Sequence, residues 1–424
     1  MRFILKNISF NLSSISIFFL FLLMLWSMNP WFSWHYWGIM VFFFTCCFLL
    51  LRLALISNKI NNYSITVLSL FAAAFAFLVY SMMYLRRAEG IPDIYIFIRT
   101  VLVFFLVISM HPKEQENIVT ITTTAYALLV GISMFAYLLV VIGIELPYSI
   151  IDKPDDRYPP FLNFRLFIIG MHESVFLKRF QSVFTEPGHL STISALFLYV
   201  NRYELKRKSV LIILISLLLS LSLSGYFLLF LGYFIQVLTR SKRLFKTVSI
   251  IVIVTVMLAG IGYFYYIVYP DSLFSSMILS RLEYYLFSEG GPGFIQDRTS
   301  KHFDYYYETQ FLKSTEEVLW GKGPEFGETY FKRMGMSYKV FLFRNGIITI
   351  ILLFFLYLSI VSVKPTRQGF GLLFLYTVSF LQRTYALWEM QLFLFIGAIQ
   401  YFYTESYGNK ECIERQLKPI LEEQ

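Results

Sequence analysis

The chain of 424 residues is 57% hydrophobic and only 15% charged. Soluble domains carry about 25% charged residues, so this composition argues against an ordinary soluble enzyme. The net charge of +9 would suggest nucleic-acid binding in a soluble protein, whereas in a membrane protein it first reports orientation. The 3 cysteines, Cys46, Cys47 and Cys412, make neither a disulfide framework nor a metal cluster.

Apolar stretches recur along the whole chain. A membrane-spanning helix needs about 20 such residues, so the sequence predicts an all-α polytopic integral membrane protein with about twelve spans. The first stretch is long and lacks a small-residue cleavage site, so we expect a retained signal anchor with a cytoplasmic N-terminus. The predicted spans lie at 10–28, 36–56, 64–85, 91–110, 118–145, 187–200, 210–223, 225–239, 247–269, 341–362, 369–384 and 388–404.

The basic residues give the expected orientation. Cytoplasmic short loops carry an excess of Lys and Arg. With both termini in the cytoplasm, the short loops on the opposite side hold only Arg86, Arg87 and Arg383. The segments expected inside hold Arg2, Lys6, Arg52, Lys59, Lys113, Arg202, Lys206, Arg207, Lys208, Arg240, Lys242, Arg243, Lys246, Lys364, Arg367, Lys410, Arg415 and Lys418.

Two segments are too long to be simple connectors, and both fall on the outer side. Long loops are usually functional or disordered. We therefore expect a five-span bundle (1–145), a first extracytoplasmic loop (146–186), a four-span segment (187–269), a large extracytoplasmic loop (270–340), a three-span segment (341–404) and a cytoplasmic tail (405–424). The large loop is rich in tyrosine and glycine, and its best helical candidate is 298–318, with Asp297 as a cap.

The first candidate site ends the first loop at 178–189 and opens the sixth span. Thr185 is a plausible N-cap, and Pro187 fits the first helical turn. A helix N-terminus at the outer surface suits an anion, and Arg179 adds a planar guanidinium that matches phosphate oxygens. The alternative is that Lys178 and Arg179 are interfacial anchors and that Glu186 is a helix-start residue.

The second candidate site lies in the large loop. It begins with Asp297 to His302, which include Arg298, Lys301 and His302, and continues with Tyr305 to Tyr307. It ends with Trp320 and with Lys322, which lies between two glycines. Aromatic faces beside charged groups commonly hold sugar rings, but aromatic residues also form interfacial belts, and a solvated loop helix is the competing interpretation.

Within the spans, two features are less specific. Arg99 lies in the middle of the fourth span, where an ionisable residue suggests either a functional site or a structural pairing. Ser216, Ser220 and Ser224 recur every four residues, which predicts close helix packing on one face.

The order of these landmarks resembles a known family. The segment from Arg179 to Gly188 leads into a span, and a serine-rich span then ends at Gly225. A basic inner loop and a large outer loop follow. The segment from Trp320 to Gly323 then leads to Asn345 and Gly346. This arrangement is similar to the O-antigen and exopolysaccharide polymerases of the Wzy type, in the O-antigen ligase and polymerase superfamily of GT-C-like glycosyltransferases. The resemblance covers about residues 175–360.

The resemblance implies an inverting, metal-independent glycosyltransferase without a cofactor. It would transfer the growing glycan from an undecaprenyl-pyrophosphate donor to a lipid-linked repeat unit on the outer side of the cytoplasmic (inner) membrane. Arginines in the two outer loops are needed in that family, and they match Arg179 and Arg298. Glu186 or His189 could take the acceptor's proton. Lys178, Lys301, His302, Tyr305, Trp320 and Lys322 are the candidate substrate-binding residues.

The expected partners are the undecaprenyl-pyrophosphate-linked oligosaccharide and membrane lipid, with a chain-length regulator and a flippase as candidate protein partners and no nucleic acid. The chain departs from the family pattern in three ways. Gly225 and Tyr226 stand where an arginine often follows the serine-rich span, and neither Arg179 nor Arg298 is followed eleven residues later by glycine. The histidine that ligases carry is also missing near Ser337 and Tyr338, which favours a polymerase over an O-antigen ligase.

A flippase or transporter of lipid-linked oligosaccharides is the main rival class. Such carriers place functional groups near the membrane midplane, show a two-fold repeat and keep their loops short. This sequence has one clear intramembrane candidate, Arg99, and a large outer loop. Sugar composition, linkage and chain length do not follow from the sequence, nor does the choice between O-antigen, capsule and exopolysaccharide.

Overall fold

The computed structural model describes residues 12–55, 102–152, 160–171, 179–240, 257–275, 299–331 and 337–422, with short gaps at 29, 35–36, 105, 109, 258–259, 271, 273–274, 324–325, 327–329 and 383–388. The described chain is mostly helical, as the composition predicts. The predicted span 64–85, most of 91–110 and the first part of 247–269 lie outside the described residues.

Three helices form the N-terminal part. Helices α2 (Leu12–Ser27) and α3 (Trp37–Leu55) pack side by side across the short turn η1 (Trp31–Ser33), and α2 also packs on α6 (Pro112–Val141). Helix α6 begins with Pro112 and a capping box, in which His111 and Glu114 satisfy each other's backbone N–H groups. An ion pair of 3.0 Å between Arg52 and Glu114 joins α3 to α6, and the Ser13 hydroxyl donates to the same carboxylate.

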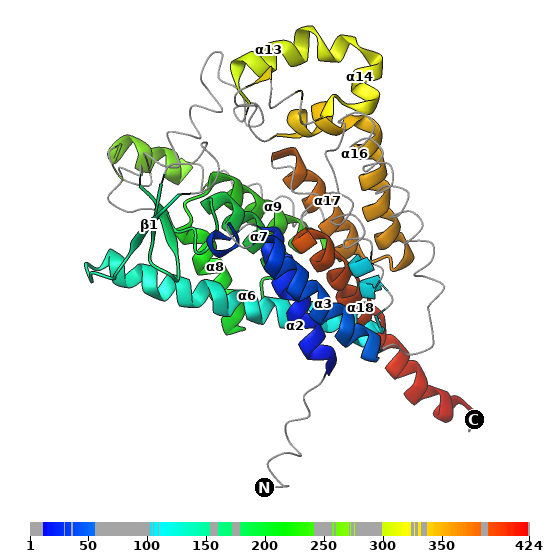
Figure 1. Ribbon diagram of the computed structural model, residues 1–424. Helices are drawn as coiled ribbons and strands as arrows, with labels where there is room; N and C mark the ends of the chain where they lie inside the picture. Colours follow the sequence, from blue (N-terminus) through cyan, green and yellow to red (C-terminus); the bar gives the residue numbers. More distant parts are fainter. Residues whose placement is uncertain are drawn as a thin grey trace.

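A small antiparallel sheet follows α6, and the sequence did not predict it. Its strands β1 (Ser149–Ile151), β2 (Phe161–Asn163) and β3 (Ile168–Gly170) pair in that order, with Phe161 opposite both Ile151 and Gly170. The Ser133 hydroxyl of α6 donates to the Leu166 carbonyl at 2.7 Å, and the Phe167 ring packs on Tyr137. The described part of the first long loop is therefore folded, and it is fixed to the C-terminal part of α6 (Figure 1).

The central helices are α7 (Pro187–Val200), α8 (Lys208–Leu219) and α9 (Leu223–Arg240). Every residue of α7 is buried, although the helix also carries the polar residues His189, Ser191, Thr192 and Ser194. The serine-rich stretch is not one continuous helix, because Leu221 adopts a left-handed conformation (φ 47°) between α8 and α9. The expectation that Ser216, Ser220 and Ser224 share one helix is therefore wrong, although all three are buried.

The large loop contributes α13 (Lys301–Thr309), η3 (Phe311–Lys313) and α14 (Thr315–Trp320), which Figure 1 shows at the top of the molecule. Helix α16 (Tyr338–Val363) begins beneath them and is broken at Gly346 (φ 74°). Helices α17 (Arg367–Gln382) and α18 (Glu389–Glu422) complete the chain, and α18 continues through the predicted tail. The predicted helix at 298–318 is divided at Gln310, and Ser300 caps its first part.

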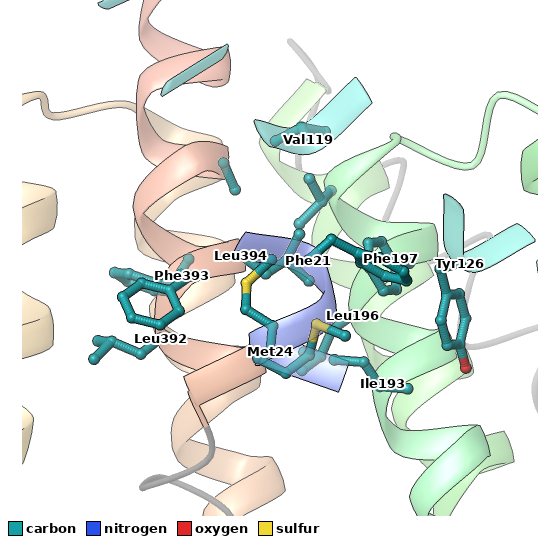
Figure 2. Close-up of a cluster of buried hydrophobic side chains, with 14 of the residues drawn as sticks. Phe21, Met24, Val119, Tyr126, Ile193, Leu196, Phe197, Leu392, Phe393 and Leu394 are labelled. Carbon is teal, nitrogen blue, oxygen red and sulfur yellow. The ribbon is translucent and has the colours of Figure 1, made fainter. Parts of the chain in front are cut away.

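The main core lies where α2, α6, α7 and α18 meet. Figure 2 shows Phe21 and Met24 of α2 converging with Phe197 of α7 and Leu394 of α18. The Tyr126 ring of α6 stacks on Phe197 with centroids 4.7 Å apart. This core holds the start of α7 in a fixed position relative to three other helices.

Three described helices are long and apolar enough to cross a membrane, judged by length and composition: α6, α9 and α16. Helices α2 and α8 and residues Met40–Arg52 of α3 are apolar but shorter. Large apolar side chains also remain exposed on these helices, including Leu50, Leu128, Phe135 and Phe355. Exposed apolar faces of this kind are unusual in soluble monomers and fit contact with lipid. The fold is compatible with an all-α membrane protein.

Candidate functional site

Arg179 connects two landmarks that are far apart in the sequence. Its Nε–H donates to the Ser220 carbonyl at 3.2 Å, and the neighbouring Phe180 N–H donates to the Leu219 carbonyl at 3.1 Å. Both carbonyls belong to the C-terminal end of α8, which carries the negative end of the helix dipole and suits a cation. Arg179 also acts electrostatically on the Tyr226 hydroxyl in the first turn of α9. The end of the first loop therefore lies on the serine-rich segment.

The start of α7 differs by one residue from the prediction. The N-cap is Glu186, not Thr185, and Pro187 is the first helical residue. The physical reason is that a residue before proline is pushed out of the helical region, and Glu186 accordingly has φ −134° and ψ 143°. Its side chain makes no capping hydrogen bond to the first turn.

Glu186 and His189, the two candidate proton acceptors, lie on the same side of this first turn. Their side chains are 3.9 Å apart, between the His189 Nε2 and a Glu186 carboxylate oxygen. The Glu186 side chain is 29% exposed, whereas that of His189 is 7% exposed. The carboxylate is therefore the one that can reach a group outside the protein, and the imidazole lies behind it.

Gly225 lets α9 approach α7 closely beside this turn. A Cβ on Gly225 would lie 2.3 Å from the Ser191 Cβ and 2.6 Å from its Oγ, so only glycine fits. The Ser222 and Ser224 hydroxyls, both buried, hydrogen-bond to each other at 3.1 Å. The serine-rich segment thus forms one wall of a polar region around the N-terminus of α7.

The second candidate site is built differently. Lys301 and His302 are exposed in the first turn of α13, where the His302 ring stacks on Tyr330 with centroids 5.6 Å apart. Tyr305, also on α13, is 68% exposed, and Trp320 at the end of α14 is 37% exposed. Tyr305 and Trp320 are the predicted aromatic residues with the most accessible surface for a ligand.

Lys322 has structural contacts. Its Nζ pairs with Glu317 at 2.9 Å, donates to the Tyr306 hydroxyl and lies 4.4 Å from the centre of the Phe326 ring. Burial lowers the pKa of Lys322, but the hydrogen bonds to Tyr306 and Glu317 outweigh it and raise the pKa overall. The residue is therefore a charged link between α14 and α13.

Two candidate residues cannot be placed. Lys178 and Arg298 lie outside the described residues, as do Arg99 and Asp297. Within the described part of the chain, no group of three or more His, Cys, Asp or Glu side chains is arranged to hold a metal ion. The described site residues form two clusters, one around α7 and one on α13 and α14.

Sequence reasoning missed several polar residues around α7. Gln181, Ser182 and Thr192 are buried beside the residues that were singled out. Ser182 adopts a left-handed conformation (φ 54°), which is uncommon for residues other than glycine. Nothing in the pattern of the sequence marks these three, because their significance comes from burial in the folded chain.

Comparisons with known proteins give no match: no family model, no curated protein and no solved structure matches the chain.

Proposed function

We propose that the chain is a polysaccharide polymerase of the cytoplasmic membrane, with about twelve spans, a GT-C-like fold and both termini in the cytoplasm. It would transfer the growing glycan from an undecaprenyl-pyrophosphate donor to a lipid-linked repeat unit on the outer side. The observation that carries this proposal is the position of Arg179, which bonds to the end of the serine-rich helix at Ser220 beside the N-terminus of α7.

The proposed chemistry is an inverting displacement. An acceptor hydroxyl attacks the anomeric carbon of the donor, the bond from that carbon to the pyrophosphate oxygen breaks, and the acceptor's proton passes to a base. Pyrophosphate leaves with its polyprenyl chain. The protein must stabilise the charge that develops on the leaving oxygen, which a fixed guanidinium and a helix N-terminus can do. Arg179 and Arg298 are the proposed arginines.

Glu186 is the better candidate for the base. Its carboxylate is more exposed than the His189 imidazole, and a general base must come within hydrogen-bond reach of the proton that it accepts. His189, behind it, is suited to orienting the carboxylate. Around the second cluster, Tyr305 and Trp320 offer exposed aromatic surface for sugar rings, and Lys301 lies exposed one turn from Tyr305.

The test is the glycan profile of cells that depend on variants of this protein. Arg179→Ala should abolish polymer while the protein remains in the membrane. Arg179→Lys keeps the charge but loses the fork of donors, so it should restore little polymer. Arg165→Ala is the matched control, because Arg165 is exposed in the β2–β3 turn of the same loop. Full-length polymer from cells with Arg179→Ala would contradict the proposed role of Arg179 in polymerisation.

The same profile separates the polymerase from a flippase. Cells without a polymerase still attach a single repeat unit to the lipid acceptor, because the unit has reached the outer side. Cells without the flippase attach none. A deletion strain that shows the single unit supports the polymerase, and a strain that lacks even this unit supports the transporter.

A further inference from the structure

Three polar side chains around the start of α7 are buried without a hydrogen-bond partner among the described residues. They are Gln181, through its Nε2, Ser182, through its Oγ, and Thr192, through its Oγ1. Each residue is at most 3% exposed. Buried polar groups are nearly always paired, because an unpaired one destabilises the fold. Three of them so close together in the sequence therefore need a physical explanation.

Thr192 behaves differently from other threonines in helices of this chain. Thr45, Thr122 and Thr349 each donate to the carbonyl four residues earlier, at 2.5 to 2.7 Å. For Thr192 that carbonyl belongs to Gly188, which accepts instead from the Ser191 hydroxyl at 3.2 Å. The usual bond within the helix thus goes to the neighbouring residue.

The position of Thr192 directs its hydroxyl toward the first turn of α7. Residues four apart share a helix face, and helical side chains lean toward the N-terminus. Gly188, which precedes Thr192 by four residues, has no side chain to cover that face. The N-cap Glu186 makes no capping bond with its side chain. Pro187 has no N–H group and the His189 N–H donates to the Glu186 carbonyl, so Gly188 supplies the first-turn N–H that faces the same region.

Gln181 and Ser182 lie in the turn just before the helix. The turn is closed by the Phe184 N–H, which donates to the Gln181 carbonyl, and the Ser182 carbonyl accepts from the Ile168 N–H of β3. Ser182 has φ 54°, a conformation that stores strain in a residue with a side chain and is found often at functional sites.

We infer that Gln181, Ser182 and Thr192, together with the N-terminus of α7, form a subsite for a phosphate group, separate from Arg179. One amide and two hydroxyls can all donate hydrogen bonds to phosphate oxygens, and the helix N-terminus favours negative charge. The identity of the ligand, a lipid-linked pyrophosphate, rests on the proposed function. Arg179 would hold one phosphate and the neutral donors the other.

The experiment measures binding to the purified full-length protein in detergent. Farnesyl pyrophosphate is the probe, and its binding is measured by tryptophan fluorescence. Trp31 reports on this turn because its backbone N–H donates to the Val183 carbonyl. Thr192→Val and Gln181→Leu should each weaken binding by about tenfold, the usual effect of losing a hydrogen bond to a charged group. The control is Thr122→Val, which removes a buried hydroxyl already bonded within its own helix, and its affinity should not change.

The unfolding temperature separates a ligand role from a structural role. Thr192→Val removes an unpaired buried hydroxyl without changing the shape of the side chain, so the unliganded variant should unfold at the same temperature as the wild type or higher. Weaker binding together with this result supports the subsite. Unchanged affinity in both variants overturns it, and so does weaker binding together with a lower unfolding temperature, because Thr192 would then act through the fold.

Further arms identify the source of the phosphate and separate this inference from the polymerase. Equal binding of inorganic pyrophosphate would assign the affinity to the diphosphate alone, whereas competition by phosphatidylglycerol vesicles would assign the subsite to a phospholipid headgroup.

If the variants lose binding while Arg179→Ala cells still make full-length polymer, the subsite stands and the polymerase fails. If Arg179→Ala abolishes polymer while the variants bind normally, only the subsite fails.

Discussion

The backbone around Gly321 and the backbone around Gly346 approach so closely that neither glycine has room for a side chain. A Cβ on Gly321 would come within 2.6 Å of the Gly346 nitrogen, and a Cβ on Gly346 within 2.2 Å of the Leu319 carbonyl oxygen. Both have positive φ, 79° and 74°. Next to this contact the Lys322 N–H donates to the Phe343 carbonyl at 2.7 Å. The end of α14 therefore packs directly against the break in α16.

This contact joins α13, α14 and the part of α16 before Gly346 into one unit, called here the cap. Its apolar centre consists mainly of buried side chains from α13, η3 and the start of α16, including Phe303, Phe311 and Phe343, and Val318 of α14 packs against them. The first turns of α16 thus belong to the cap.

The first prediction concerns the two glycines. Gly321→Ala and Gly346→Ala should each destabilise the cap, because the new Cβ meets backbone atoms that cannot move aside and because a left-handed residue with a side chain costs about 1–2 kcal/mol. Trp320 adjoins Gly321, so the change can be followed by its fluorescence during thermal unfolding.

Gly143→Ala is the matched control for this pair. Gly143 also has a positive φ, 94°, but a Cβ there meets nothing within 4 Å. Its substitution should therefore show the conformational cost alone, and the Gly321 and Gly346 variants should exceed it. Equal effects at the three positions would mean that the close approach does not matter.

The second prediction tests the contact between α7 and α9. Gly225→Ala should destabilise the protein and reduce polymer, because its Cβ would overlap the Ser191 side chain. Replacing Ser191 by glycine as well removes the overlapping atoms and leaves the Ser191 Cα position 3.4 Å away, an ordinary contact. The double variant should recover stability relative to Gly225→Ala. If it is no better, the clash is not the cause.

The sequence predicted the parts of the fold that depend on local apolar runs. The span 187–200 coincides with α7, because Pro187 and the polar residues after Val200 mark both ends. The break at Gly346 could not be predicted, because the apolar pattern continues through it and the need for glycine arises from the backbone of Leu319 and Trp320, which lies against it across space. The three-residue strands were too short for a periodic signal, although the aromatic and β-branched residues around the Asn163 turn were a clue.

The candidate site was predictable in part for the same reason. Glu186 stood out because it precedes a proline at the start of an apolar run, and Arg179 because its guanidinium lies a few residues before the same helix start, and both are local patterns. The bond from Arg179 to Ser220, and the burial of Gln181 and Thr192, depend on how distant segments fold together. Sequence alone also suggested Lys322 as a substrate-binding residue, and its ion pair with Glu317 appears only in the folded cap.

The third prediction is a loss of cap stability at alkaline pH. Burial, with the neighbouring Tyr338 and Glu308, raises the pKa of Tyr307 to about 12. In the unfolded chain a tyrosine ionises near pH 10. Between these values the unfolded state loses the proton and the folded state keeps it, so the free energy of unfolding falls as pH rises from about 10 toward 12.

Tyr307→Phe should flatten this pH dependence, since the substitution removes the ionising group and keeps the buried ring. The measurement is the unfolding temperature against pH, with tyrosinate absorbance as a second readout. Tyr305→Phe, which alters an exposed tyrosine on the same helix, should keep the wild-type slope. An unchanged slope in Tyr307→Phe would contradict the assignment.

The fourth prediction concerns the ion pair between Lys339 and Asp304. The Lys339 side chain is 7% exposed, and its Nζ lies 3.0 Å from the Asp304 carboxylate, which also accepts from the Thr299 hydroxyl. Lys339→Met should lower the free energy of unfolding by about 1.5–3 kcal/mol, the range for a hydrogen bond to a charged group. A double-mutant cycle with Asp304→Asn isolates the coupling between the two side chains.

Arg207→Met serves as the comparison. Arg207 and Glu204 lie 2.8 Å apart, but both are exposed, at 47% and 38%, and exposed pairs contribute about 0–1 kcal/mol. The loss at Lys339 should therefore be clearly larger. A coupling between Lys339 and Asp304 no larger than that of the exposed pair would show that burial adds nothing to it.

The fifth prediction uses two adjacent tyrosines that face opposite ways. Tyr305 is 68% exposed, whereas Tyr306 is 7% exposed and packs against Phe331 and Phe343. If the cap holds sugar rings on its outer aromatic surface, Tyr305→Ala should reduce polymer several-fold without changing the unfolding temperature. Tyr306→Ala should lower the unfolding temperature, because truncating a buried aromatic ring costs about 3–5 kcal/mol. Polymer length on a gel and thermal unfolding of the same preparations separate the two effects. Normal polymer from a Tyr305→Ala, Trp320→Ala double variant would remove this surface from the glycan-binding site and leave the cap with a structural role alone.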